Sequence, residues 1–319
     1  MTVENGLNVS GPDSVVVTNG AMHGLYILIR AMLDPGDQVI VPDPMWNEVC
    51  DNIILAGGIP VPVNLRAEDA YQYDPQAIEA AITARTRAIF VNTPHNPTGS
   101  VADLTTLEAM AAVAEKYNLR LVSDEAYEHV IFDGRKHASL GSIPAAQGRT
   151  ISVFSMSKTY AMSSLRLGYL VLNDTATLDR IKKLVRCTIN SVNSVTQYGA
   201  AAALNRPQDA TRWMAQEYEM RRDVLFDALE ESPYLKAFKP QGAFYLWARI
   251  LPDWPGYGGK ADGWSMTNYL IDQTAIGSTP GSAFGPAGAE HIRFAFSCST
   301  AQINEAAGLL PGVLRAAKN

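Results

Sequence analysis

The stretch SVFSMSKTYAMSSLRLGYLV, residues 152–171, joins two apolar runs through a polar segment that holds a single lysine. The first run is typical of a strand. Hydroxyls at Ser155 and Ser157 follow it, then Lys158, and Arg166 stands just before the second run. A lysine amine near two hydroxyls and a guanidinium indicates a site for a molecule that carries both an aldehyde and a phosphate.

Pyridoxal 5′-phosphate (PLP) carries both groups on one ring, and the sequence therefore favours it as a cofactor. A lysine amine forms a Schiff base only when it is deprotonated, so the site must lower the pKa of Lys158 by desolvation or by a nearby positive charge. Arg166 is placed to anchor the phosphate and to disfavour the ammonium form. Taken alone, the segment is also consistent with a surface lysine and a structural arginine.

Two other segments point to the same place. The sequences VNTPHNPTG (91–99) and VSDEAYEHV (122–130) each follow an apolar, β-branched run. Because the carboxyl ends of parallel strands meet at one crevice, we expect Asn96 and Asp124 to lie near Lys158. An aspartate beside a pyridine nitrogen keeps that nitrogen protonated, which makes the ring an electron sink. Alone, an Asp-Glu pair after a strand is more typical of a helix N-cap.

The segment 15–33, VVVTNGAMHGLYILIRAML, predicts a strand, a glycine-bearing turn and an amphipathic helix. Free N–H groups at Gly20, Ala21 and Met22 would form an anion site at the helix start, supported by the helix dipole. We expect this turn to complete the phosphate site, although TNG before a helix is otherwise ordinary turn chemistry. Trp46 follows the next strand, where it either stacks on an aromatic ring or packs in the core.

An arginine interrupts the apolar alternation of HIRFAFS, residues 291–297. Alternation places Arg293 on the face opposite Ile292 and Phe294. A guanidinium grips a carboxylate with two parallel hydrogen bonds, so Arg293 is a candidate for the α-carboxylate of an amino acid. The alternative is an arginine paired with an internal Asp or Glu.

The motifs HNPTG, SDEAY, SMSKTYAMSSLRLGY and IRFAFS occur in this order along the chain. In this combination the chain resembles the PLP-dependent aminotransferases of fold type I, class I/II, the aspartate aminotransferase superfamily. The resemblance covers essentially all 319 residues. It implies a large PLP-binding domain over residues 1–205, a small C-terminal α+β domain over residues 206–319, and a homodimer that includes the segment 190–197 in its interface.

The resemblance also implies a role for each matching residue. The catalytic residues are Lys158, which forms the Schiff base and shuttles a proton, Asp124 on the pyridine nitrogen, and Tyr127. The cofactor is bound by a larger set: Gly20, Ala21, Met22, Trp46, Asn96, Asp124, Tyr127, Ser155, Ser157, Lys158 and Arg166. Within it, Asn96 and Tyr127 hydrogen-bond the ring's phenolic oxygen. The substrate α-carboxylate is bound by Asn96 and Arg293, and no metal is expected.

The chain departs from the family pattern in two places. Ser163 and Ser164 replace the usual Pro-Gly or Thr-Gly before Arg166, which removes no hydrogen-bond donor. The sequence also begins about where a family member is already past its N-terminal arm and first helices, which would remove pocket residues and a tyrosine that reaches the partner subunit's phosphate. If that segment is truly absent, we expect reduced activity, a weaker dimer and weaker PLP binding.

Composition fits an ordinary globular protein with a sizeable core, with 47% hydrophobic and 18% charged residues. The net charge of −6 provides no large basic field, so neither nucleic acid nor an anionic membrane is an expected partner. Three widely spaced cysteines form neither a CxxC motif nor a disulfide framework, and they suit a reducing cytoplasm. No leader-like start or membrane-length apolar run is present in the sequence.

Seven strand-like runs, VVVT, QVIV, IPVPVNL, RAIFVN, LRLVSD, TISVFS and GYLVL, alternate with helical stretches such as residues 102–117. This alternation predicts an α/β layered domain with a mainly parallel seven-stranded sheet. A helical region over 175–204, broken near 190–194, leads to a smaller domain built around AFYLWARI and HIRFAFS. The glycine-rich stretch 254–264 is expected to be a surface loop or a lid.

Three functions remain open from the sequence. The first is transamination between an L-amino acid and a 2-oxo acid. The second is a PLP-dependent carbon–sulfur lyase or other β-eliminating enzyme, because the same lysine and electron sink serve elimination. The third is a PLP-binding scaffold without turnover. The amino acid is not determined: Arg186 is a weak candidate for binding a dicarboxylate side chain, and a helix-surface position fits it better.

Overall fold

The computed structural model describes residues 4–317, so the outermost residues of both expected domains, 1–3 and 318–319, lie outside it. The strands are β1 (Val15–Thr18), β2 (Gln38–Asp43), β3 (Ile59–Asn64), β4 (Thr86–Asn92), β5 (Arg120–Asp124), β6 (Thr150–Ser155), β7 (Gly168–Val171), β8 (Leu235–Phe238), β9 (Tyr245–Ile250), β10 (Thr279–Pro280) and β11 (His291–Ala295). The α-helices are α1 (Gly20–Met32), α2 (Glu48–Leu55), α3 (Pro75–Ala80), α4 (Leu104–Lys116), α5 (Met156–Thr159), α6 (Thr175–Thr188), α7 (Ser194–Asn205), α8 (Asp209–Glu230), α9 (Gly263–Thr274) and α10 (Thr300–Ala316).

The first seven strands form one sheet in the order β1-β7-β6-β5-β4-β2-β3. Four of the six pairs of neighbouring strands are parallel. The other two involve β7, which pairs antiparallel with both β1 and β6. The prediction of a mainly parallel seven-stranded sheet is therefore confirmed. Because β4, β5 and β6 are parallel, their carboxyl ends lie along one edge of the sheet, where polar side chains collect.

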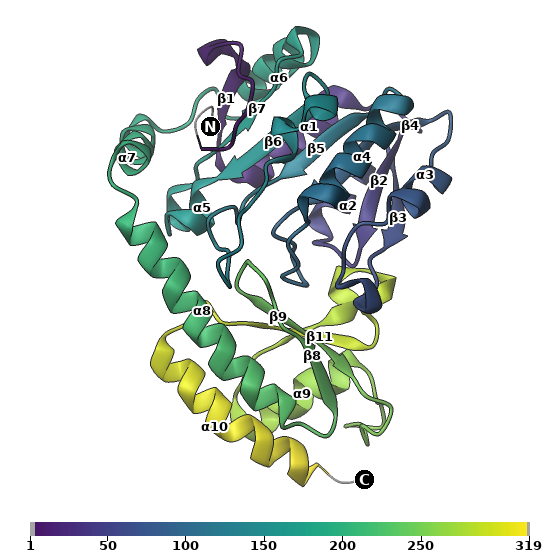
Figure 1. Cartoon of the computed structure of the whole chain (residues 1–319), viewed down its shortest axis with the longest axis vertical. Helices are drawn as coiled ribbons and strands as arrows, with labels where there is room; N and C mark the ends of the chain where they lie inside the picture. The colour runs from purple at the N-terminus through teal and green to yellow at the C-terminus, as the bar shows by residue number, and fades with distance from the viewer. Residues whose placement is uncertain (1–3, 318–319) are drawn as a thin grey trace.

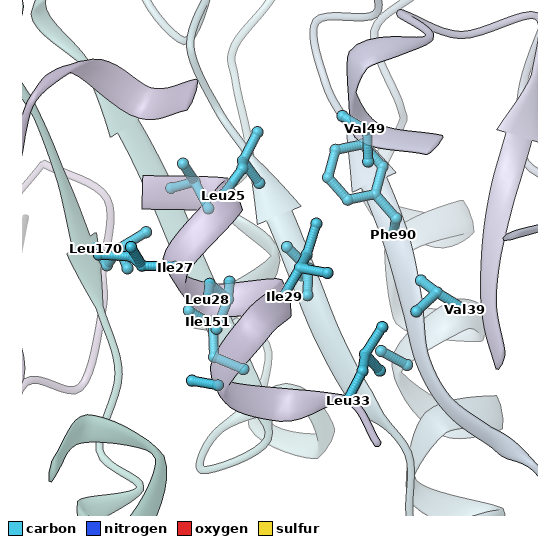
Figure 2. Packing of buried hydrophobic residues seen from close by; sticks show 14 of the residues in the cluster. Leu25, Ile27, Leu28, Ile29, Leu33, Val39, Val49, Phe90, Ile151 and Leu170 are labelled. Carbon is cyan, nitrogen blue, oxygen red and sulfur yellow. The ribbon is translucent and has the colours of Figure 1, made fainter. Parts of the chain in front are cut away.

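Helix α1 packs across the large sheet through its apolar side chains (Figure 2). Leu25, Ile27 and Leu28 are fully buried because the helix is apolar on the face that meets the strands. Their partners on the strands include Phe90 and Leu170. Each such side chain contributes about 1.5–3 kcal/mol of hydrophobic stabilisation, so this contact fixes the start of α1 firmly against the sheet.

The predicted helix over 102–117 is shorter at its start than the pattern suggested. Asp103 caps α4, because its carboxylate accepts a hydrogen bond from the Thr106 N–H at 2.7 Å. The break expected near 190–194 is confirmed, since α6 ends at Thr188 and α7 begins at Ser194.

A second sheet, β10-β11-β9-β8, lies below the large one and is covered by α8, α9 and α10 (Figure 1). Helix α8 runs down one side of the molecule, from the level of the large sheet to the small one, and packs against α10. The carboxyl-end edge of the large sheet therefore faces the small sheet. Within residues 4–317, no helix combines the length and the hydropathy needed to cross a bilayer.

Candidate active site

A cavity of about 250 Å³ lies at the carboxyl ends of β4, β5 and β6. All but one of the residues predicted from the sequence line it, namely Ala21, Met22, Trp46, Asn96, Asp124, Tyr127, Ser155, Ser157, Lys158, Arg166 and Arg293. The remaining one, Gly20, lies directly behind the Arg166 guanidinium, because a Cβ built on Gly20 would clash with that group. The structure thus brings together residues as far apart in the sequence as Ala21 and Arg293.

One end of the cavity is lined by hydroxyls, N–H groups and Arg166. Gly20 starts α1 with φ of 81°, a conformation that glycine adopts freely. The Ser155 hydroxyl caps α5, accepting a hydrogen bond from the Ser157 N–H at 3.1 Å. Arg166 Nη1 donates to the Ser163 carbonyl at 2.8 Å, which directs the guanidinium toward Gly20. These groups form a cationic, donor-rich pocket of the kind that binds phosphate.

Lys158 lines the cavity and lies near two aromatic rings. Its Nζ is 5.4 Å from the Phe244 ring centroid and 6.0 Å from that of Tyr127. Burial, followed by the positive charges of Arg293 and Arg166, lowers the pKa of Lys158, although Asp124 opposes the shift. The conditions that favour a nucleophilic, deprotonated amine are therefore present.

Asp124 is buried at the end of β5, with 7% of its surface exposed. Its carboxylate accepts a hydrogen bond from the Ala126 N–H at 3.1 Å. Burial raises the pKa of Asp124 to about 6, with a further increase from Glu125 and a decrease from Lys158. A buried carboxylate with few partners favours a cation placed opposite it.

The Tyr127 hydroxyl lies 2.8 Å from the Tyr245 hydroxyl. Burial raises the pKa of Tyr127 well above its ordinary value, so the phenol remains protonated and can donate. The Tyr245 ring in turn lies under the Arg293 guanidinium, with Cζ 4.2 Å from the ring centroid. The two tyrosines thus connect the large sheet to the small one at the cavity.

Arg293 has no carboxylate within salt-bridge distance among residues 4–317, which contradicts the alternative of an internal ion pair. Its Nη1 donates to Asn96 Oδ1 at 2.8 Å, and in the described part of the chain its buried Nε has no hydrogen-bond partner. The ring of Phe284 lies on it, 4.5 Å from Cζ. Because a buried guanidinium without an anion is costly, this geometry indicates a site for an anion from outside the protein.

The family model for class I and II aminotransferases matches residues 3–310. The chain belongs to this family. Among its curated relatives, the aspartate aminotransferase of Geobacillus stearothermophilus is 32% identical over 289 residues, 90% of this chain and 72% of that protein. Aromatic-amino-acid aminotransferase 2 of Thermococcus litoralis is 33% identical over 319 residues, 98% of this chain and 79% of that protein.

Solved structures agree with this assignment. The aromatic aminotransferase of Pyrococcus horikoshii OT3 superposes with a TM-score of 0.92 at 31% identity, covering 98% of this chain and 83% of that one. The resemblance inferred from the motifs and the expected fold are therefore confirmed, and the protein is a PLP-dependent aminotransferase.

The aminotransferase cavity also contains residues that the sequence analysis missed. The polar ones are Asn92, Ser163 and Tyr245, and the apolar ones are Leu25, Met45, Val49, Phe90 and Ala126. Asn92 is the last residue of the strand that leads to the HNPTG motif, and a polar residue at the carboxyl end of a parallel strand could have been predicted to line the cavity. Tyr245 lies inside an apolar strand, AFYLWARI, where nothing distinguishes it from a core residue.

Two regions considered from the sequence lie outside the cavity. Arg186 is exposed on α6, beside Lys182 and Lys183, as expected for a helix-surface arginine. The stretch 254–264 packs on α9, where Tyr257 donates to Asp272 at 2.8 Å, so it is a surface loop and not a lid over the cavity.

Proposed function

We propose that this aminotransferase transfers an amino group between an L-amino acid and a 2-oxo acid, with PLP bound in the cavity and linked covalently to Lys158. One observation carries the proposal: a lysine of lowered pKa shares a cavity with a buried carboxylate and with an arginine that has no internal anion. An amine for the aldehyde, a carboxylate for the ring nitrogen and a guanidinium for the substrate carboxylate are the three groups that a pyridoxal ring and an amino acid require.

The residues present fit the cofactor. The Arg166 guanidinium lies where a Cβ on residue 20 would be, so only glycine leaves room for it. Together with Ser155, Ser157 and the N–H groups of Ala21 and Met22, Arg166 would hold the phosphate. Trp46 lines the cavity and is half-buried, which suits a ring stacked on the cofactor.

When bound, PLP supplies an electron sink for the carbanion formed at the substrate Cα. Asp124 would hold the proton on the ring nitrogen, since a cation beside this carboxylate offsets the cost of burying its charge. Tyr127 and Asn96 would bind and orient the ring's phenolic oxygen. The Lys158 amine would take the proton from the substrate Cα and deliver it to C4′ of the cofactor, and it would carry the proton back in the reverse half-reaction.

Arg293 would bind the substrate α-carboxylate through two parallel hydrogen bonds, with Asn96 fixing the plane of the guanidinium. This contact orients the Cα–H bond toward Lys158, which converts the proton transfer into an intramolecular step. The relatives named above are an aspartate aminotransferase and an aromatic-amino-acid aminotransferase, so both amino acids are candidate donors for the assay described below.

We further propose that the protein is a cytoplasmic homodimer, with a large domain over residues 1–205 and a small domain over residues 206–319. Support for a partner comes from α7 and the start of α8, whose apolar side chains face solvent. Val195 is 77% exposed, Tyr198 80% and Trp213 61%. A second copy would cover this surface, which includes the segment 190–197.

The test begins with purified protein loaded with PLP and reduced with borohydride. We expect mass spectrometry to find the stable adduct on Lys158, and an adduct on another lysine would contradict the assignment. A screen of amino donors against 2-oxoglutarate, followed by the cofactor's absorbance change, would then identify the substrate. Product analysis in the same assay separates transamination from β-elimination, because elimination needs no second oxo acid and releases the Cβ leaving group, a thiol for a carbon–sulfur lyase, with ammonia and an oxo acid.

A further inference from the structure

Strands β2 and β4 run side by side only at their beginnings. The pairing of β2 with β4 begins at Gln38 with Thr86 and ends at Ile40 with Ile89. Strand β4 then continues beside β5 as far as the pair Asn92 and Asp124. Thr93 N–H bonds to the Asp124 carbonyl, so the N–H and C=O of Asn92 point the other way, toward the space that β2 has left. Buried main-chain groups in such a position need another partner.

The Tyr73 hydroxyl is that partner. It accepts a hydrogen bond from the Asn92 N–H at 2.8 Å and donates one to the Asn92 carbonyl at 3.1 Å. Tyr73 is 6% exposed and precedes α3, whose first turn is capped by Asp74. One phenol thus replaces the strand that β4 lacks on this side.

The Asn92 side chain reaches in the direction of the cavity. Its Nδ2 donates to the Asp124 carbonyl at 3.1 Å, and its Oδ1 accepts from the Asn96 N–H at 2.9 Å. Asn96 then accepts a hydrogen bond from Arg293. The side-chain amide of Asn92 therefore hydrogen-bonds to the main chain of both Asp124 and Asn96. The main chain of Asn92 is in turn held by the Tyr73 hydroxyl.

We propose that Tyr73 and Asn92 are positioning residues, which fix the spacing between Asp124 and Asn96 across the cavity. The inference rests on the function proposed above. Among residues 4–317, no other side chain hydrogen-bonds to the main chains of both Asp124 and Asn96, so a small shift of Asn92 moves both. Even a small displacement of these side chains reduces the reaction rate, because the reacting groups must be held within a fraction of an ångström of the productive geometry.

Tyr73→Phe removes one hydroxyl and leaves the two main-chain groups of Asn92 unpaired. We expect the variant to bind PLP on Lys158, to show an amino-acid kcat/KM about tenfold lower, and to shift the pH midpoint of the bound cofactor's visible absorbance. Asn92→Ala should show the same changes more strongly. The absorbance titration is independent of turnover.

Tyr71→Phe is the matched control. Tyr71 lies two residues earlier in the same connection, is 5% exposed, and does not line the cavity. Both Phe variants lose a buried hydroxyl, so both are expected to lower the melting temperature. Only Tyr73→Phe should change the cofactor titration and kcat/KM.

The inference is overturned if Tyr73→Phe matches Tyr71→Phe in titration midpoint and kcat/KM while both lose thermal stability. If Asn92→Ala does not fold, the Tyr73→Phe comparison decides the matter by itself. Wild-type protein that does not carry PLP on Lys158 would overturn the proposed function, and this inference with it. Failure of the inference alone would leave the wild-type adduct intact.

Discussion

Asp124 and Glu125 are neighbours in the sequence and both are buried, at 7% and 0% exposure, yet their surroundings differ completely. Asp124 is the last residue of β5 and lines the cavity, whereas Glu125, the first residue after the strand, does not. The Glu125 carboxylate accepts from Ser139 Oγ at 2.8 Å and pairs with His137 Nε2 at 2.8 Å. Among residues 4–317, the Asp124 carboxylate receives only the Ala126 N–H.

The electrostatics of the two carboxylates follow from these partners. Burial opposes a charge on His137, but the hydrogen bond and charge of Glu125 outweigh it and raise the pKa of His137. Asp124 has no such partner in contact, and burial raises its pKa to about 6. A buried charge that the protein satisfies belongs to the structure, whereas one that it leaves unsatisfied indicates a binding site.

The largest effect should come from removing the unsatisfied carboxylate. We expect Asp124→Ala to retain PLP but to slow Cα deprotonation by several orders of magnitude, because an unprotonated pyridine is a poor electron sink. Single-turnover absorbance measurements with a good amino donor check this. Near wild-type rates would reduce Asp124 to a local turn residue and remove the contrast with Glu125.

Removing the satisfied carboxylate should affect stability instead. Glu125→Ala leaves the His137 Nε2 and the Ser139 hydroxyl without partners in a buried site, at an expected cost of about 3–5 kcal/mol in the free energy of unfolding. Urea denaturation measures this, and the folded fraction should bind PLP as the wild type does. A loss of catalysis without a loss of stability would show that the two carboxylates are not divided in this way.

The pH dependence of stability sharpens the same comparison. The folded-state pKa of Asp124, about 6, lies above its unfolded value of 3.8, so the folded chain binds more protons between these values and stability falls as pH rises through them. The ionised group then costs about 3 kcal/mol in the cofactor-free protein above pH 7. Asp124→Asn should therefore stabilise that protein at pH 7.5, with a gain that shrinks toward pH 4.

Denaturation of the cofactor-free wild type and of Asp124→Asn at several pH values provides the measurement. A difference between them that does not vary with pH would mean that Asp124 is satisfied in the folded protein. PLP should reverse the order of stability, since only the wild-type carboxylate can pair with the ring nitrogen.

Arg293 is the cationic counterpart of Asp124, and the expected effect at this position is the smallest of the four. Arg293→Lys keeps the charge but removes the two-pronged hydrogen bonding, so amino-acid kcat/KM should fall by roughly 100-fold while the cofactor spectrum is unchanged. For an amine that lacks the α-carboxylate, kcat/KM should differ little between Arg293→Lys and the wild type. An equal loss for both would make Arg293 a structural residue like Glu125.

Much of the molecule follows from local sequence. The seven strands of the large sheet are apolar, β-branched runs with period or length typical of strands, and the structure contains all of them. Lys158, Asp124 and Arg293 could be singled out because each is a charged residue within an apolar strand or shortly after one, where a buried charge is costly without a partner. That they share one cavity follows from the parallel order of strands, which the alternation of strands and helices predicts.

The positions that sequence reasoning missed depend on contacts between distant segments. Tyr245, for example, meets Tyr127 across 118 positions. The Tyr73 hydroxyl meets Asn92 only because β2 diverges from β4 and leaves a gap. In the sequence, Tyr73 and Tyr245 look like ordinary core residues.

The sequence by itself determined the strands, the helices and the chemical identity of the reactive side chains, because periodicity and residue type are local properties. Only the tertiary structure decided which buried polar groups are satisfied and which are left for a ligand. Satisfaction depends on the atoms that other elements bring within about 3 Å, and those atoms are placed by sheet order and by the packing of the two sheets.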